Sequence, residues 1–204
     1  KGAGLAEMTN AGIPVPPGYT ITTQACRQFY EAGGKLLDSI VTEEDEALRR
    51  LEKLLGRRLG DAANPLLVSV RSGSPLSMPG MMDTVLNLGL NDGSVKGLAE
   101  QSGGDVRFAL DAYRRFIQMF GKIVMDVPGE VFEEALDNAK ERKGEGASDT
   151  DLDADDLEQL TGEFLGIYHE HTGQDFPIEP REQMRLAIEA VFKSWNGKRA
   201  RDYR

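Results

Sequence analysis

The spacing of apolar and polar positions predicts that this chain is mainly helical. Leucines recur at intervals of three and four residues over residues 42–59, and the opposite face of that segment is charged. A stronger apolar stripe covers residues 106–123 and ends at Pro128-Gly129. Further helices are predicted over residues 2–11, 23–32, 130–142, 155–171 and 181–195. We therefore expect the carboxy-terminal half to form a compact helical bundle.

Strand-like patterns are confined to the amino-terminal half. Residues 19–22 have the aromatic and β-branched content of a strand. Residues 66–71 form the clearest strand pattern, dense enough in apolar residues to predict burial on both faces, with Arg71 at its end. Residues 72–90 are rich in Gly, Ser, Pro and Met and predict a long functional loop or a loop with short strands. The expected fold class is α+β.

Composition and charge exclude several functional classes. The net charge of −10 provides no broad basic surface, which argues against general nucleic-acid binding. The uninterrupted apolar stretches are far shorter than the roughly 20 residues that span a bilayer, so no membrane segment is expected. Cys26 is the one cysteine, so no intrachain disulfide can form, and a cytoplasmic location is the default expectation. We interpret Cys26 as a small apolar filler.

The segment from residue 68 to residue 89 is the strongest candidate for chemistry. It combines a strand that ends in Arg71 with a loop of glycines and hydroxyl residues. Such a loop can direct backbone N–H groups at phosphates, and a guanidinium binds phosphate oxygens with two parallel hydrogen bonds. The alternative is that Arg71 pairs with a carboxylate and the loop is a surface crossover, because no Walker-type motif is present. Met78, Met81 and Met82 fit either core packing or a flexible nucleotide lid.

Two other features superficially suggest metal sites. His169 and His171 are two residues apart, which directs them to different sides of a helix, so a shared metal is not expected. Ala154 and Leu160 stand where a calcium-binding loop needs glycine and glutamate. Acidic residues at the start of a helix explain the aspartate run more simply. That run consists of Asp149, Asp151, Asp153 and Asp155.

The segment 68–89 closely resembles the arginine strand and loop of pyruvate, phosphate dikinases. The resemblance includes residues 77–84, Ser-Met-Pro-Gly-Met-Met-Asp-Thr. The family's amino-terminal signature normally has two glycines before the lysine that matches Lys1, so we expect residues to precede it. Similarity extends over essentially the whole chain, with further matching runs at residues 1–9, 13–23, 113–120 and 190–195.

The resemblance implies the first lobe of an ATP-grasp domain with an α-helical insert. The implied organisation is a first-lobe α/β subdomain at residues 1–90, a helical subdomain at 91–196, and a return to the ATP-grasp core at 197–204. It also implies that Lys1 and Arg71 bind the phosphates of ATP. Mg²⁺ would accompany ATP with ligands expected beyond Arg204, so no metal ligand is assigned in this chain. The residues implied to lie in a loop near the phosphates are Gly80, Met81, Met82, Asp83 and Thr84.

The implied reaction belongs to a longer enzyme. It converts ATP, pyruvate and phosphate to AMP, phosphoenolpyruvate and diphosphate through a phosphohistidine on a separate domain, in a protein that is usually homodimeric. No catalytic residue is therefore assigned within this chain. One alternative is phosphoenolpyruvate synthase or another water dikinase, whose arginine segment usually diverges after Val-Arg-Ser. An alternative of a different class is a non-catalytic helical module that binds another protein through residues 91–196.

Overall fold

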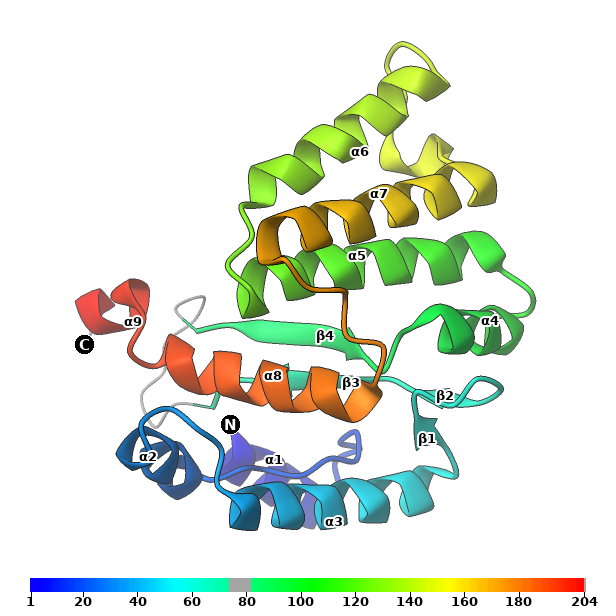
Figure 1. The fold of residues 1–204 in the computed structure, drawn as a ribbon. Coiled ribbons are helices and arrows are strands. Elements are labelled where there is room, and N and C mark those ends of the chain that lie inside the picture. The colour runs from blue at the N-terminus through cyan, green and yellow to red at the C-terminus, as the bar shows by residue number, and fades with distance from the viewer. Residues whose placement is uncertain (74–81, 204) are drawn as a thin grey trace. The chain divides into compact units, whose positions relative to one another are not determined.

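The computed structural model describes residues 1–73 and 82–203, and it is a mixed structure of helices and short strands (Figure 1). The chain divides into two compact units. Unit 1 contains Lys1–Arg57, Arg71–Thr84 and Ile188–Arg204, and unit 2 contains Arg58–Val70 and Val85–Ala187. The predominance of helix over strand agrees with the expected α+β class. In the described ranges, no helix is long and apolar enough to cross a membrane.

Unit 1 builds its core from both ends of the chain. Phe29 and Leu48 are fully buried, and the ring of Phe29 lies 5.4 Å from the ring of Phe192. The hydroxyl of Tyr30 donates a 2.8 Å hydrogen bond to the carbonyl oxygen of Phe192. These contacts join segments that are more than 160 residues apart. The helices that contribute to unit 1 are α1 (Gly2–Asn10), α2 (Thr23–Glu31), α3 (Asp38–Leu55), the end of α8 (Pro180–Ser194) and α9 (Lys198–Tyr203).

Two sequence predictions for unit 1 need correction. Residues 19–22 are not a strand, since they find no strand partner among the described residues. Thr22 is extended and instead caps α2, where its Oγ1 accepts a hydrogen bond from the backbone N–H of Ala25. Helix α3 ends at Leu55 rather than near residue 59, because Gly56 takes the left-handed conformation that closes a helix.

The strands of the described ranges form two small sheets. Strand β1 (Arg58–Leu59) pairs in parallel with β2 (Pro65–Leu66), and β3 (Val68–Arg71) pairs with β4 (Thr84–Leu88). Figure 1 shows β3 and β4 running in opposite directions. The predicted single strand over 66–71 is therefore interrupted at Leu67, and its predicted burial on both faces is wrong. Strand β3 alternates half-buried and exposed residues, and of the predicted strand only Leu66, in β2, is buried.

Unit 2 contains an aromatic core between its helices. The ring of Phe176 lies 5.5, 5.3 and 5.2 Å from the rings of Phe116, Phe120 and Tyr168, each in an edge-to-face arrangement. Helices α5, α6 and α7 lie side by side (Figure 1). The periodic patterns predicted these three helices and α8, whereas α4 was not predicted. The helical elements of unit 2 are α4 (Asp92–Gln101), α5 (Val106–Val124), α6 (Gly129–Lys143), η1 (Asp149–Asp151), α7 (Ala154–Thr172) and the start of α8.

The cysteine lies on α2 and is half-buried. Burial raises the pKa of the Cys26 thiol, because desolvation disfavours the thiolate. A thiol that stays protonated near neutral pH suits the expected role as an apolar filler.

Candidate functional site

Lys1 is held against the segment that follows strand β3. It lies at the N-cap of α1, and its Nζ donates a 2.8 Å hydrogen bond to the carbonyl oxygen of Ser72. Ser72 is buried, whereas Lys1 is exposed. An ammonium has three N–H donors, so this bond leaves two for a ligand. The structure therefore brings the first residue of the chain next to a segment 71 residues away.

Arg71 ends strand β3 with its side chain exposed. Residues alternate between the faces of a strand, so Arg71 shares the exposed face with Ser69. In the part of the chain that the structure describes, no carboxylate forms an ion pair with Arg71 and its guanidinium makes no hydrogen bond. The described structure thus gives no support to the alternative in which Arg71 pairs with a carboxylate. Its planar set of five N–H donors remains available for an anion.

Lys1 and Arg71 are drawn together through the two residues that follow β3. Ser72 is the immediate neighbour of Arg71 and accepts the Lys1 hydrogen bond. A Cβ added to Gly73 would lie 3.8 Å from the Cβ of Lys1, so the lysine stem lies against this backbone. Lys1 and Arg71, which begin the first two chain segments of unit 1, are therefore related through Ser72. Such a pair can neutralise the charge of a phosphate group.

The predicted phosphate-loop residues are placed only in part. Gly80 and Met81 lie outside the described residues, while Met82, Asp83 and Thr84 lie within them. Thr84 begins β4, and Asp83 immediately before it is already engaged. The Oδ1 atom of Asp83 lies 3.0 Å from an Nη atom of Arg199, and its backbone N–H donates to the hydroxyl of Ser194 over 3.4 Å. Asp83 therefore acts as an anchoring point rather than as an open carboxylate.

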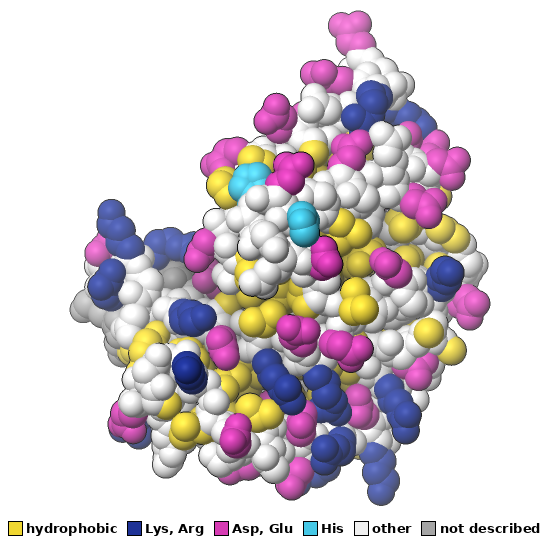
Figure 2. Space-filling view, in the orientation of Figure 1, with side chains coloured by type: hydrophobic (Ala, Val, Ile, Leu, Met, Phe, Trp, Pro, Cys, Tyr) yellow, Lys and Arg dark blue, Asp and Glu magenta, His cyan; other side chains and the backbone are white. Residues whose placement is uncertain are grey.

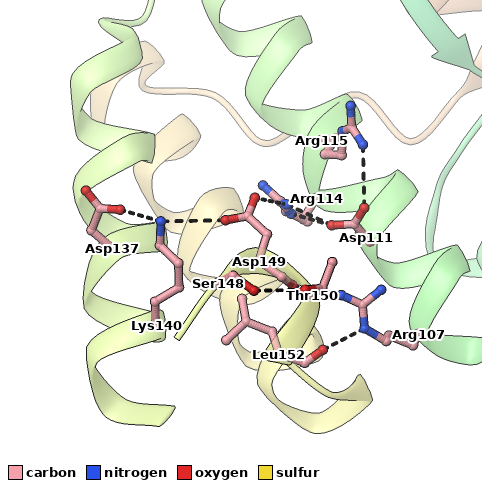
Figure 3. Close-up of polar contacts among 10 residues, drawn as sticks. All are labelled: Arg107, Asp111, Arg114, Arg115, Asp137, Lys140, Ser148, Asp149, Thr150 and Leu152. Carbon is pink, nitrogen blue, oxygen red and sulfur yellow. Dashed lines mark hydrogen bonds and ion pairs between the residues drawn. The ribbon is translucent and has the colours of Figure 1, made fainter. Parts of the chain in front are cut away.

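The aspartate run has two structural roles in unit 2, the first of which joins helices. The carboxylate of Asp149 forms an ion pair with the buried guanidinium of Arg114 at 3.1 Å, and Arg114 also pairs with Asp111 at 2.8 Å (Figure 3). Arg107 donates to the backbone oxygen of Asp149 at 2.7 Å, and the Nζ of Lys140 lies 3.5 Å from its carboxylate. Asp149 thus links α5, α6 and η1. Pairing of the buried Arg114 with both carboxylates satisfies a charge that would otherwise be costly.

The second role is helix capping. The Oδ1 atom of Asp153 accepts hydrogen bonds from the backbone N–H groups of Asp155 and Asp156 at 3.1 Å, which caps α7. The side chain of Lys143 donates to Asp153 and is the main cause that lowers the pKa of this carboxyl to about 2. The expected helix amino-terminus is therefore confirmed for Asp153. Within residues 1–73 and 82–203, no group of three or more His, Cys, Asp or Glu side chains could hold a metal.

The two histidines have separate partners at the end of α7. The Nδ1 atom of His169 lies 3.0 Å from Oδ1 of Asp175, and the Nδ1 atom of His171 lies 3.0 Å from the carbonyl oxygen of Ile167. Figure 2 shows the two imidazoles, in cyan, apart from one another on this face. The two imidazoles therefore have different contacts, with a side chain for His169 and with a backbone carbonyl for His171.

Comparison with known proteins places this chain in a family. A family model described as the pyruvate phosphate dikinase AMP/ATP-binding domain matches residues 1–47 and 39–204. The chain belongs to this family. Pyruvate, phosphate dikinase 1, chloroplastic, from Arabidopsis thaliana is 54% identical over 204 residues, covering 100% of this chain and 21% of that relative. Pyruvate, phosphate dikinases from Clostridium symbiosum and Entamoeba histolytica are 51% and 50% identical over 205 and 204 residues, each covering 100% of this chain and 23% of the relative.

The family resemblance drawn from the sequence is thus confirmed along the whole chain. The chain spans about a fifth of the length of these curated relatives, between 21% and 23%. The match is to the nucleotide-binding part of the dikinases rather than to a complete enzyme.

Sequence reasoning missed the side chains that support the candidate site of this dikinase domain. Arg199 on α9 and Ser194 on α8 both contact Asp83, more than 100 residues away. Ser194 lies in the family-like run 190–195, but that run names no partner for it, and helix α9, which carries Arg199, was not predicted. The basic composition of residues 198–201 was the one available signal, and it does not specify a partner.

Proposed function

We propose that this chain is the ATP-binding portion of a pyruvate, phosphate dikinase and that Lys1 and Arg71 bind the phosphates of ATP. The observation that carries the proposal is the hydrogen bond from Lys1 Nζ to the carbonyl oxygen of Ser72, the residue after Arg71. It places an ammonium beside the strand end that presents an exposed guanidinium. The family match to an AMP/ATP-binding domain indicates that the ligand is an adenine nucleotide.

The two cations would have different tasks. The guanidinium of Arg71 can hold two oxygens of one phosphate in a fixed plane, whereas the ammonium of Lys1 acts as a compact point charge. Together they would hold the polyphosphate in position and stabilise charge that develops on the transferred group. Asp83 would hold in position the end of the loop that is proposed to lie near the phosphates, since its carboxylate is paired with Arg199.

The complete reaction is part of the proposal. ATP, pyruvate and phosphate would be converted to AMP, phosphoenolpyruvate and diphosphate through a phosphohistidine outside this chain, with Mg²⁺ bound alongside ATP. No residue of this chain is proposed to hold the metal. His169 and His171 are not proposed as the phosphohistidine, because the proposed reaction places that residue on a separate domain.

We also propose that the fold is the first lobe of an ATP-grasp domain with a helical insert. In this proposal, residues 1–90 form the lobe, residues 91–196 form the insert, and residues 197–204 return to the lobe. Support comes from unit 1, which combines the first 57 residues, Arg71–Thr84 and the last 17 residues from Ile188. The bounds of the unit differ from those of the proposed lobe, since unit 2 includes Arg58–Val70 and resumes at Val85. A compact unit built from both ends of a chain is what an insert between them produces.

The proposal is tested by replacing Arg71 in a longer dikinase polypeptide that carries these residues. Arg71→Ala should abolish phosphorylation of the enzyme by ATP while leaving its melting temperature unchanged, because Arg71 is exposed and unpaired among the described residues. Arg50→Ala is the matched control, since Arg50 is an exposed arginine on α3 of the same unit. Normal ATP-dependent phosphorylation in the Arg71→Ala protein would overturn the proposal.

A further inference from the structure

Asp83 is fixed from two directions by residues near the carboxy-terminal end of unit 1. Its Oδ1 atom lies 3.0 Å from the guanidinium of Arg199, and its backbone N–H donates to the hydroxyl oxygen of Ser194 over 3.4 Å. The hydroxyl of Ser194 in turn donates to the carbonyl oxygen of Val191 at 2.7 Å, which orients it. The Asp83 side chain is 23% exposed and that of Arg199 is 67% exposed. Asp83 is thus partly buried, and both its backbone N–H and its carboxylate have partners.

The contacts of Asp83 complement those of Lys1. Lys1 contacts the backbone immediately after β3 at Ser72, and Arg199 pairs with the side chain of Asp83, the residue immediately before β4. Strands β3 and β4 are paired and run in opposite directions (Figure 1), so the end of β3 and the start of β4 lie at the same edge of the sheet. The position of Asp83 therefore affects the edge at which Arg71 is presented.

We infer that Arg199 is a positioning residue for the ATP site, acting through Asp83, and this inference rests on the function proposed above. Arg199 need not touch ATP, since its guanidinium is directed at the Asp83 carboxylate. An ion pair between partly exposed groups contributes little energy, so its loss should change nucleotide affinity modestly, by roughly two- to fivefold. A small displacement of a positioning group is enough to produce a change on this scale.

The test compares four variants of the longer dikinase polypeptide that carries these residues. Arg199→Gln and Asp83→Asn should each raise the KM for ATP roughly two- to fivefold, leaving the KM for pyruvate and the melting temperature at wild-type values. The double variant should match either single variant, because both changes remove one interaction. Arg201→Gln is the control, since this exposed arginine lies on the same helix and forms no ion pair among the described residues.

Arg199→Lys gives a second readout, because a lysine keeps the charge and should restore part of the ATP affinity. The inference is overturned if Arg199→Gln behaves like Arg201→Gln, if the two single effects add in the double variant, or if the KM for pyruvate rises equally. Arg71→Ala is measured in parallel to separate this inference from the proposed function. Loss of ATP-dependent phosphorylation in Arg71→Ala, with no ATP effect in Arg199→Gln, would overturn the role of Arg199 and leave the proposed function standing.

Discussion

Gly2, the residue that follows Lys1, has no room for a side chain. A Cβ added to Gly2 would lie 2.8 Å from both Cγ2 and Oγ1 of Thr20, closer than side chains pack. Thr20 is β-branched and has few rotamers with which to move away. A Cβ added to Gly4, two residues further along the same helix, meets nothing within 4 Å. Glycine is thus required for space at the first position of α1 and not at the third.

Gly2→Ala should destabilise the protein because the new methyl group overlaps Thr20. We expect a loss of about 1–3 kcal/mol in the free energy of unfolding, as for other overpacked sites. Gly4→Ala should instead have no cost or stabilise slightly, since alanine favours helix over glycine. Urea denaturation of both variants checks the prediction. Equal effects of the two substitutions would show that α1 does not pack against Thr20.

The charge of Asp153 contributes stability that depends on pH. Lys143 is the main cause that lowers the pKa of this carboxyl to about 2, below its value in an unfolded chain, so the contribution is present above about pH 4 and is lost as the pH falls towards 2. Asp153→Asn keeps the helix cap but removes the charge. Wild type should therefore be more stable than Asp153→Asn at pH 6, and the difference should shrink between pH 4 and pH 2.5. Denaturant titrations at several pH values measure it, and a difference independent of pH would contradict the assignment.

At the scale of elements, helices with continuous apolar stripes were predicted, whereas α4 and α9 were not. Helices α5 and α7 have regular apolar positions, so their periodicity identified them. Helix α4 contains Gly93 and Gly97, which weaken helix propensity, and α9 has only six residues. Helix α4 forms because of tertiary packing, which a single sequence does not reveal.

The packing of α4 explains why residue 97 is a glycine. A Cβ on Gly97 would lie 2.4 Å from the carbonyl oxygen of Ala62 and 2.8 Å from Cδ of Pro65. A Cβ on Gly162, inside α7, meets nothing within 4 Å. Close approach of α4 to the segment before β2 therefore requires glycine, whereas the exposed position on α7 does not.

Alanine substitutions at these two helix glycines should change the free energy of unfolding in opposite directions. Gly97→Ala should destabilise by about 1–3 kcal/mol, because backbone atoms cannot move aside as a flexible side chain can. Gly162→Ala should stabilise by about 0.5–1 kcal/mol through helix propensity alone. Both values come from denaturant unfolding curves at neutral pH. A stabilised Gly97→Ala protein would mean that α4 does not approach Ala62 as closely as described.

The candidate site could be predicted from the sequence only through family resemblance. Periodicity identified the strand that ends in Arg71, but it gives no reason to join Lys1 to Ser72 across 71 residues. The resemblance named Lys1 and Arg71 together, and the structure supplies the contact that relates them. The anchoring of Asp83 by Arg199 and the pairing of Arg114 with Asp149 required the folded chain, because each connects elements without a local signal.

At the scale of the whole molecule, the chain has a net charge of −10, and its proposed phosphate site consists of two cations. General electrostatic attraction cannot draw ATP to such a protein, since both are negatively charged. Binding would depend on local, charge-assisted hydrogen bonds from Lys1 and Arg71. In the proposed function these bonds reach only the phosphates, so their removal should leave recognition of the nucleoside intact.

The most direct test of phosphate binding compares ATP with adenosine. Dissociation constants for both are measured by calorimetry or competition, with wild type and Arg71→Ala in the longer dikinase polypeptide. Arg71→Ala should weaken ATP binding by about tenfold or more, as expected for the loss of hydrogen bonds to a charged group, and leave adenosine binding unchanged. Unchanged ATP affinity, or equal weakening of ATP and adenosine, would contradict the assignment of Arg71 to the phosphates.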